Sequence, residues 1–220
     1  MKSWARDHGL MLANLALFLA FFLGMVLTGV HVYNDNQQAH GESVVTVVRY
    51  LTTGEFLEAT FENWESEFLQ MGMYVVLTAF LFQRGSSESK PMDGSAPQDK
   101  DPRMKRNDPN APWPVRRGGP ILKLYENSLS ILFFLLFFLS VALHAIGGVD
   151  AYNSEQLAHG EAGVTLMRYF GTSQFWFESM QNWQSEFLAV ATIVGGSVYL
   201  RQRGSPESKP VAEPHTETGA

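Results

Sequence analysis

The chain has 220 residues, a formal net charge of −6 and no cysteine. The lack of cysteine excludes disulfides, thiolate metal sites, iron–sulfur clusters and cysteine nucleophiles. Apolar residues are clustered in a few long runs, which is typical of a membrane protein rather than of soluble domains. The sequence contains no nucleotide-binding loop, no Ser/His/Asp hydrolase pattern and no basic surface for nucleic acid, so we expect no nucleic-acid partner.

Four apolar runs predict an all-α integral membrane protein with four transmembrane helices. Leu10–Val30 and Leu129–Val149 are 21 residues long and carry no ionised side chain, and about 20 helical residues cross a hydrocarbon core of about 30 Å. Phe68–Phe82 and Phe187–Leu200 are shorter. Each follows an Asn-Trp-x-Ser-Glu motif and ends near basic residues, so an interfacial indole and snorkelling cations extend the span.

The distribution of charge orients these four spans. Of the 16 Lys and Arg residues, 14 lie in three segments that four crossings place on one side: Met1–Gly9, Gln83–Lys123 and Arg201–Ala220. The positive-inside rule makes that side cytoplasmic. We therefore expect a multi-pass protein of the bacterial inner (plasma) membrane, with the lipid bilayer as its partner and both termini in the cytoplasm.

The sequence repeats itself at an offset of 119 residues. Between Tyr33 and Gln70, 19 of 38 positions are identical to their counterparts. The repeated unit holds two crossings, which predicts two helical hairpins in the same orientation, a parallel repeat about a pseudo-two-fold axis along the membrane normal. The expected organisation is a first hairpin at residues 1–84, a flexible cytoplasmic linker at 85–119, a second hairpin at 120–203 and a disordered cytoplasmic tail at 204–220.

The outer connection of each hairpin is predicted to be ordered and helical. Glu42–Leu51 has apolar residues at helical spacing, although its β-branched run Val44–Val48 leaves a strand as the alternative. Thr52–Gly54 then interrupts the pattern. One long helix is expected over Glu55–Arg84, because hydroxyl residues precede it and acids occupy its first turns.

Repeated polar residues near the outer ends of the second and fourth spans form the first candidate site. Acids beside hydrocarbon are costly unless they are hydrated, paired or neutralised. The expected basic partners are the two arginines predicted to lie outside, giving a structural ion-pair site whose members are Arg49, Asn63, Glu67, Arg168, Asn182 and Glu186. We expect Arg49 to pair with Glu67, and Arg168 with Glu186.

A second pattern raises the question of a cofactor. The repeated His-Gly-Glu sequences provide possible ligands for a divalent metal at His40, Glu42, His159 and Glu161. A helix cap is the competing interpretation, in which the acid complements the helix dipole. Haem is disfavoured, because the candidate axial ligands His31 and His144 are not equivalent under the repeat: their counterparts are Asp150 and Met25.

Three tryptophans, Trp64, Trp113 and Trp183, are expected to anchor the chain at the membrane interface. The motifs Ala-His-Gly-Glu, Arg-Tyr, Asn-Trp-x-Ser-Glu-Phe-Leu and Gln-Arg-Gly-Ser-x-Glu-Ser-Lys-Pro each occur twice. In this combination the chain resembles a bacterial family of small four-span proteins known as a domain of unknown function. The resemblance implies a membrane location and brings no activity to these residues.

The sequence therefore favours a non-catalytic structural or accessory subunit of a bacterial inner-membrane assembly, with other membrane-protein subunits as partners. One alternative is a metal-binding or redox membrane protein that uses His40, Glu67, His159 and Glu186. Another is a small carrier or proton conductor in which Glu67 and Glu186 titrate.

Overall fold

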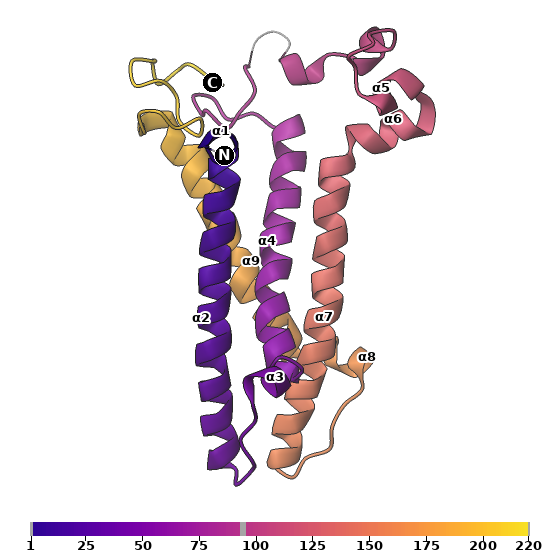
Figure 1. The fold of residues 1–220 in the computed structure, drawn as a ribbon, viewed down its shortest axis with the longest axis vertical. Coiled ribbons are helices and arrows are strands. Elements are labelled where there is room, and N and C mark those ends of the chain that lie inside the picture. The colour runs from indigo at the N-terminus through magenta and orange to yellow at the C-terminus, as the bar shows by residue number, and fades with distance from the viewer. Residues whose placement is uncertain (1, 93–95, 220) are drawn as a thin grey trace. The chain divides into compact units, whose positions relative to one another are not determined.

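The computed structural model describes residues 2–92 and 96–219, and within them it contains helices and no strand. Figure 1 shows the long helices as continuous rods linked by short elements. The elements are α1 (Lys2–Asp7), α2 (Gly9–Ala39), α3 (Val47–Tyr50), α4 (Gly54–Phe80), η1 (Pro97–Asp99), η2 (Pro102–Lys105), α5 (Trp113–Arg117), α6 (Gly119–Glu126), α7 (Ser128–Ala158), α8 (Leu166–Tyr169) and α9 (Ser173–Tyr199). The all-α prediction is confirmed for the described residues.

Three helices recur with the sequence offset. The bounds of α2, α3 and α4 return 119 residues later, without a shift at either end, as those of α7, α8 and α9. We call residues 9–80 the first segment and residues 128–199 the second segment. The identical lengths show that the local signals for helix start and stop are present in both segments.

Two of the helices, α2 and α7, are long and apolar enough to cross a membrane, by length and composition. They contain the predicted spans Leu10–Val30 and Leu129–Val149. Among the described helices, α4 and α9 have 27 residues each but do not meet the same combined requirement of length and composition. Helix α4 begins one residue before the predicted Glu55 and ends at Phe80 rather than Arg84.

The chain divides into two compact units. The first unit comprises Met1–Phe61 and Ala142–Phe175. One hydrophobic cluster in this unit contains four buried residues: Val26 and Val30 of α2, Tyr50 of α3 and Phe56 of α4. Met25 is one of the apolar side chains that pack against it. The Tyr50 ring lies close over Gly29, and a Cβ added at that glycine would collide with it. A small residue is therefore needed where the outer connection returns to α2.

The second segment repeats this aromatic packing within the first unit. Tyr169 lies over Gly148 as Tyr50 lies over Gly29. The ring centroids of Tyr152 and Tyr169 are 5.6 Å apart at 49°, the same values as for the matching pair in the first segment. The outer connections are thus two copies of one local structure.

Side-chain hydrogen bonds fix both outer connections. The Asn34 amide exchanges two hydrogen bonds with the backbone of Val45, at 2.7 and 3.0 Å, and Asn153 does the same with Val164. Thr46 caps α3 through a bond from the Arg49 backbone N–H. The strand alternative for Val44–Val48 is wrong, because residues 42–46 are irregular and a helical turn begins at Val47.

The second unit comprises Glu62–Val141 and Trp176–Ala220. Its repeated Gln-Arg-Gly-Ser-x-Glu-Ser-Lys-Pro motif forms the same turn after α4 and after α9. The backbone N–H of Gln83 donates to the Ser89 hydroxyl at 3.0 Å, and that of Gln202 donates to the Ser208 hydroxyl at 2.9 Å. Gly85 takes the left-handed conformation that the turn requires, with φ of 83°.

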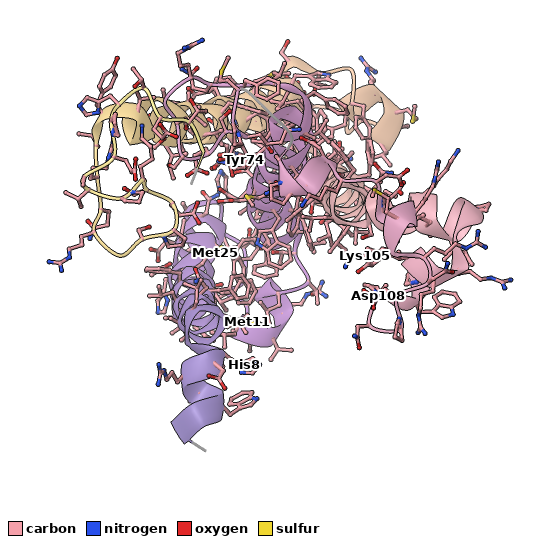
Figure 2. All side chains as sticks on the ribbon, turned by 90° about the horizontal axis from the view of Figure 1, so that it is seen from above. His8, Met11, Met25, Tyr74, Lys105 and Asp108 are labelled. Atoms are coloured by element: carbon pink, nitrogen blue, oxygen red, sulfur yellow. The ribbon has the colours of Figure 1, made fainter. Side chains whose placement is uncertain are left out.

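The connection between α4 and α7 contains the short helices η1, η2, α5 and α6, and α5 contacts both η2 and α6. Lys105 and Asp108 form an ion pair of 3.4 Å, and Figure 2 labels both residues. The Asn110 backbone N–H and then the Lys105 ammonium lower the pKa of the Asp108 carboxyl from its ordinary value. Flexibility of residues 85–119 in solution stays a prediction.

The C-terminal segment forms turns anchored by one buried ammonium. Lys209 Nζ donates to the backbone carbonyls of Pro214, His215 and Glu217 at 2.9–3.1 Å. Desolvation lowers the pKa of this ammonium, and the neighbouring Arg201 charge adds to the effect. Disorder of the tail in solution likewise stays a prediction.

Candidate functional site

The candidate site lies in the first unit, where two helices approach through glycine. A Cβ on Gly54 of α4 would lie 2.7 Å from the Gly147 carbonyl oxygen, and a Cβ on Gly147 of α7 would lie 2.6 Å from the Glu58 backbone nitrogen. Only hydrogen atoms therefore fit between the two backbones, as is usual where helices cross closely at glycine. Glu58 lies four residues after Gly54, and His144 lies three residues before Gly147, so each is about one helical turn from the crossing.

This crossing brings a carboxylate beside an imidazole. Glu58 and His144 each present a ligand atom, and these atoms lie within 4.8 Å of each other. His144 has no solvent exposure. Its ring stacks on that of Phe175, with centroids 4.9 Å apart and planes 26° apart. The position of the imidazole is therefore determined by packing rather than by solvent.

A hydroxyl from α8 orients the carboxylate. The fully buried Tyr169 donates a hydrogen bond from its hydroxyl to Glu58 Oε1 at 3.3 Å. The same tyrosine packs against Phe175, with ring centroids 5.6 Å apart. Glu58, His144, Tyr169 and Phe175 thus form a continuous cluster of polar and aromatic side chains.

A match to a family model over the full length identifies the family of this chain. A family model described as Domain of unknown function (DUF6766) matches residues 1–220. The chain belongs to this family. No curated protein and no solved structure matches it. The description of this family assigns no activity.

A fully buried carboxylate lies in the second unit. Glu65 of α4 is fully buried and accepts a hydrogen bond of 3.2 Å from the Trp183 indole N–H. Trp183 also packs edge to face on Phe137, with centroids 5.9 Å apart. Its indole N–H is therefore used inside the protein, whereas Trp113 is exposed and Trp64 is half-buried. Interfacial anchoring by the three tryptophans stays a prediction.

The repeated polar residues that the sequence selected occupy more open positions. Arg49, Asn63, Glu67 and Arg168 are exposed, while Asn182 and Glu186 are half-buried. The Gln70 amide donates to the Glu186 backbone carbonyl at 2.9 Å, and the Asn182 amide donates to that of Glu178 at 3.2 Å. The first contact joins α4 and α9, the second lies within α9, and in both the acceptor is a backbone carbonyl. The two arginine–glutamate ion pairs stay predictions.

The repeated His-Gly-Glu residues are exposed and make local contacts. His40 Nδ1 lies 2.9 Å from the Asn36 carbonyl oxygen, and His159 Nδ1 lies 2.9 Å from that of Glu155. Glu42 accepts a bond of 2.7 Å from Gln37. Within residues 2–92 and 96–219, the structure does not bring His40, Glu42, His159 and Glu161 into a common ligand group. Metal binding by these four residues has no support from their placement.

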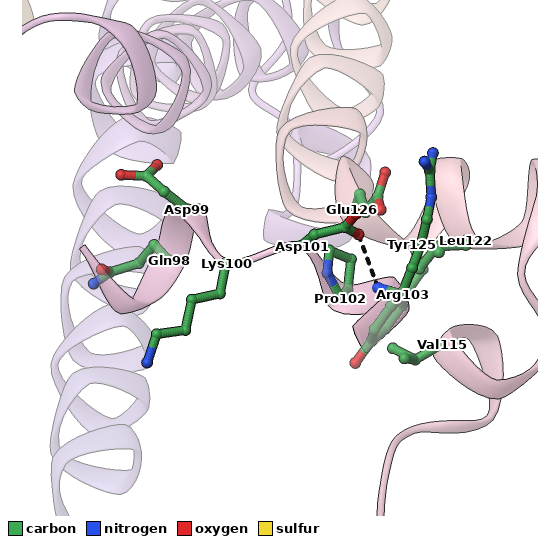
Figure 3. A pocket seen from close by; sticks show the side chains of 10 residues that line it. All are labelled: Gln98, Asp99, Lys100, Asp101, Pro102, Arg103, Val115, Leu122, Tyr125 and Glu126. Atoms are coloured by element: carbon green, nitrogen blue, oxygen red, sulfur yellow. Dashed lines mark hydrogen bonds between the residues drawn. The ribbon is translucent and has the colours of Figure 1, made fainter. Parts of the chain in front are cut away.

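An open cavity of about 550 Å³ lies in the connection before α7. Figure 3 shows its apolar wall, formed by Val115, Leu122 and Tyr125. The Asp101 carboxylate faces the cavity region but accepts a bond of 2.9 Å from the Arg103 backbone N–H. The Asp101 carboxylate thus caps the N-terminus of η2. We assign the cavity no catalytic role.

Sequence reasoning missed Glu58, His144 and Glu65 because it favoured residues present in both segments. Glu58 corresponds to Phe177, His144 to Met25, and Glu65 to Gln184. The signal that could have found them is a polar residue in one segment opposite an apolar or neutral residue in the other. Such a difference marks a position where the two segments no longer serve the same purpose.

Proposed function

We propose that the chain is an internally duplicated, four-span protein of the bacterial inner membrane and serves as a non-catalytic structural or accessory subunit of a membrane assembly. The supporting observation is that residues kept in both segments make the same local hydrogen bonds. Asn34 and Asn153 bind the outer connection, and Thr46 and Thr165 cap the helices that follow. Duplicated residues with duplicated local contacts maintain a fold.

The four-span topology has a direct test, because the chain has no cysteine of its own. Single cysteines would replace Glu42 and Glu161, which we place outside, or Lys100 and Glu213, which we place inside. A membrane-impermeant maleimide applied to intact spheroplasts should label the first pair only, and the second pair should react after permeabilisation. Labelling of Lys100→Cys in intact spheroplasts would favour two spans and contradict this topology.

The accessory role is tested in the native membrane. After mild solubilisation, an epitope-tagged chain expressed from its own locus should migrate in native electrophoresis as part of an assembly much larger than its 24.6 kDa. Chemical crosslinking before solubilisation should give the same partners in repeated experiments. Migration of all the protein as a detergent-bound monomer, with no crosslinked species, would contradict the proposal.

The carrier alternative depends on Glu67 and Glu186, which are exposed and half-buried, respectively. Proton flux into proteoliposomes tests it with Glu67→Gln and Glu186→Gln. A proton flux that is present in the original chain and lost in both variants would support proton conduction in place of the accessory role. Flux that does not change would remove Glu67 and Glu186 as proton carriers.

A further inference from the structure

The connection that leads into α7 is strongly basic, although the chain as a whole is acidic. We call residues 103–123 the basic segment. It contains six of the 16 Lys and Arg residues and one acid, a formal charge of +5 in a chain whose net charge is −6. All six cations are exposed: Arg103, Lys105, Arg106, Arg116, Arg117 and Lys123. A surface of this kind attracts anionic ligands.

The positive charge of this segment is not balanced by nearby acids. Asp108, the one acid of the segment, pairs with Lys105. Within residues 2–92 and 96–219, no ion pair is formed by Arg106, Arg116 or Arg117. The Arg106 guanidinium lies beside Gly118, where an added Cβ would be 3.8 Å from its central carbon. A cation that follows η2 is thus near the end of α5, which carries the other two arginines.

The basic segment lies next to a helix that can cross a membrane. Helix α6 ends at Glu126 and α7 begins at Ser128, and α7 is long and apolar enough for a crossing. Figure 1 shows that α6 turns away from the axis of the first turns of α7 rather than continuing it. With α7 across the bilayer, as proposed above, the basic segment lies at the level of the lipid headgroups.

Large apolar side chains are exposed in the basic segment and directly after it. They are Met104, Trp113, Leu124 and Tyr125. Helices α5 and α6 contact each other, and their buried side chains are Val115 and Leu122. Each short helix thus has a packed side, while cations and apolar groups are exposed together. This combination is typical of segments that lie in a membrane interface.

We propose that the basic segment binds the headgroups of anionic phospholipids in the leaflet at which α7 begins. Arginine donates paired hydrogen bonds to phosphate, and clusters of Lys and Arg beside a membrane helix are attracted to anionic lipids. Met104 and Trp113 enter the boundary between headgroups and acyl chains beside them. This binding rests on the proposed crossing by α7 and adds a preference for one class of lipid.

Fluorescence of the purified full-length chain in lipid nanodiscs tests this preference. The chain has no cysteine, so Met104→Cys, at a position that is 84% exposed, accepts a single bimane label. In discs of phosphatidylcholine and phosphatidylglycerol in equal parts, the label should emit at shorter wavelength and be quenched less by acrylamide than in discs of phosphatidylcholine alone. The difference should shrink in about 0.5 M NaCl, because salt screens the charges. Equal emission in the two kinds of disc would overturn the proposal and favour an acidic protein as the occupant of this surface.

The arginines are tested by removing their charge in the labelled chain. Arg116→Gln/Arg117→Gln should need at least about 5-fold more phosphatidylglycerol in mixed micelles to reach half of the shift, since each cation near an anionic surface contributes about 5-fold to binding. The matched control is Arg84→Gln/Arg203→Gln, which removes two exposed cations from the repeated turns after α4 and α9. This control should respond like the labelled original chain. Equal responses of the two variants would contradict the assignment to the basic segment.

Two further measurements identify the ligand and separate its binding from the membrane crossing. Inorganic phosphate added to phosphatidylcholine discs at matched ionic strength should not shift the emission, and a shift as large as that from phosphatidylglycerol would overturn the assignment to lipid. Gel filtration of the discs and maleimide labelling in spheroplasts report on the membrane span itself. A chain that enters the discs without responding to phosphatidylglycerol would therefore contradict the lipid preference and leave the proposed span intact.

Discussion

The two segments have the same helices but differ in what they bury. Met25 of the first segment packs on the cluster that contains Phe56, whereas its counterpart His144 stacks on Phe175. Local structure is therefore preserved while the chemistry changes from a thioether to an imidazole. The difference teaches that repeated residues maintain the architecture, and that residues unique to one segment are the better candidates for a specialised role.

The same contrast occurs along α4 and α9. The first segment has the acids Glu58 and Glu65 where the second has Phe177 and Gln184. Tyr169 donates its hydroxyl to Glu58, so an aromatic residue kept in both segments acquires a polar partner in one place. Asymmetric substitution on a symmetric framework can thus generate a single site per chain.

The largest effect is expected from Glu65, which is buried while its counterpart Gln184 is exposed. Glu65→Ala removes the acceptor of the Trp183 indole N–H and should lower the free energy of unfolding by about 3 kcal/mol, as expected for loss of a hydrogen bond together with a cavity at the buried Glu65 position. Reversible SDS unfolding in mixed micelles, followed by tryptophan fluorescence, measures this change.

Two controls accompany Glu65→Ala. Glu65→Gln keeps an acceptor oxygen and should stay within about 1 kcal/mol of the original chain. Gln184→Ala should change the free energy of unfolding by no more than about 0.5 kcal/mol, as at most exposed positions. Equal losses in Glu65→Ala and Gln184→Ala would show that the two positions do not differ in the way the structure indicates.

Gly147→Ala probes the helix crossing that positions Glu58 and His144. The added methyl group would meet the Glu58 backbone nitrogen and Leu57 Cβ at 2.6 Å, and backbone cannot move aside as a flexible side chain can. We expect a loss of about 2 kcal/mol in the free energy of unfolding, within the usual range for overpacking. Thermal unfolding in detergent measures the corresponding fall in Tm.

Gly24→Ala is the matched control for this substitution. Gly24 is also within a long helix, and a Cβ there would meet nothing within 4 Å. Alanine has the higher helix propensity, by up to about 1 kcal/mol, so this variant should be at least as stable as the original chain. A loss of stability in Gly24→Ala as large as that in Gly147→Ala would remove the close crossing as the cause.

A smaller effect is expected from Tyr169→Phe. The variant loses the hydrogen bond to Glu58 but keeps the ring over Gly148. Since hydrogen bonds to charged groups contribute about 1.5–3 kcal/mol and this one is long, we expect a loss of about 1 kcal/mol. Tyr50→Phe at the equivalent position should cost less, and double substitution with Glu58→Gln should give less than the sum of the single effects.

The sequence predicts much of the fold because the information is local. Apolar runs recur in both segments and predict the positions of α2 and α7, although each helix extends nine residues beyond the end of the predicted run. The sequence predicts the helical turn at Val47 less clearly, because the β-branched residues before it also have a high propensity for strands. The Asn34 side chain disfavours a strand, because its amide forms hydrogen bonds with the backbone N–H and C=O groups of Val45.

The candidate site could not be predicted in the same way. The repeat disfavours His144 as a haem ligand only on the assumption that a cofactor takes equivalent ligands from both segments, and that assumption does not apply to a site built in one segment. The crossing of Gly54 and Gly147 joins residues 93 positions apart, so no local pattern indicates that Glu58 lies beside His144.

The smallest effect concerns Glu55, whose counterpart is the neutral Gln174. Burial raises the pKa of the Glu55 carboxyl above its ordinary value of 4.5, its own backbone N–H opposes the shift, and Asp150 and Glu42 add to the increase. The folded chain therefore binds this proton more tightly than the unfolded chain. Its contribution to stability is favourable at low pH and declines as the pH rises from about 4.5 through the folded pKa.

Glu55→Gln should remove this decline and make the first segment match the second at this position. At pH 7 the free energy of unfolding should rise by no more than about 0.5 kcal/mol, because the carboxyl is half exposed and water screens its charge. The measurement is the Tm in detergent between pH 4 and pH 7 for both proteins, with Gln174→Glu as the reciprocal variant. The difference in Tm between Glu55→Gln and the original chain should grow with pH, and a difference that shrinks would mean that the ionised carboxylate stabilises the outer connection.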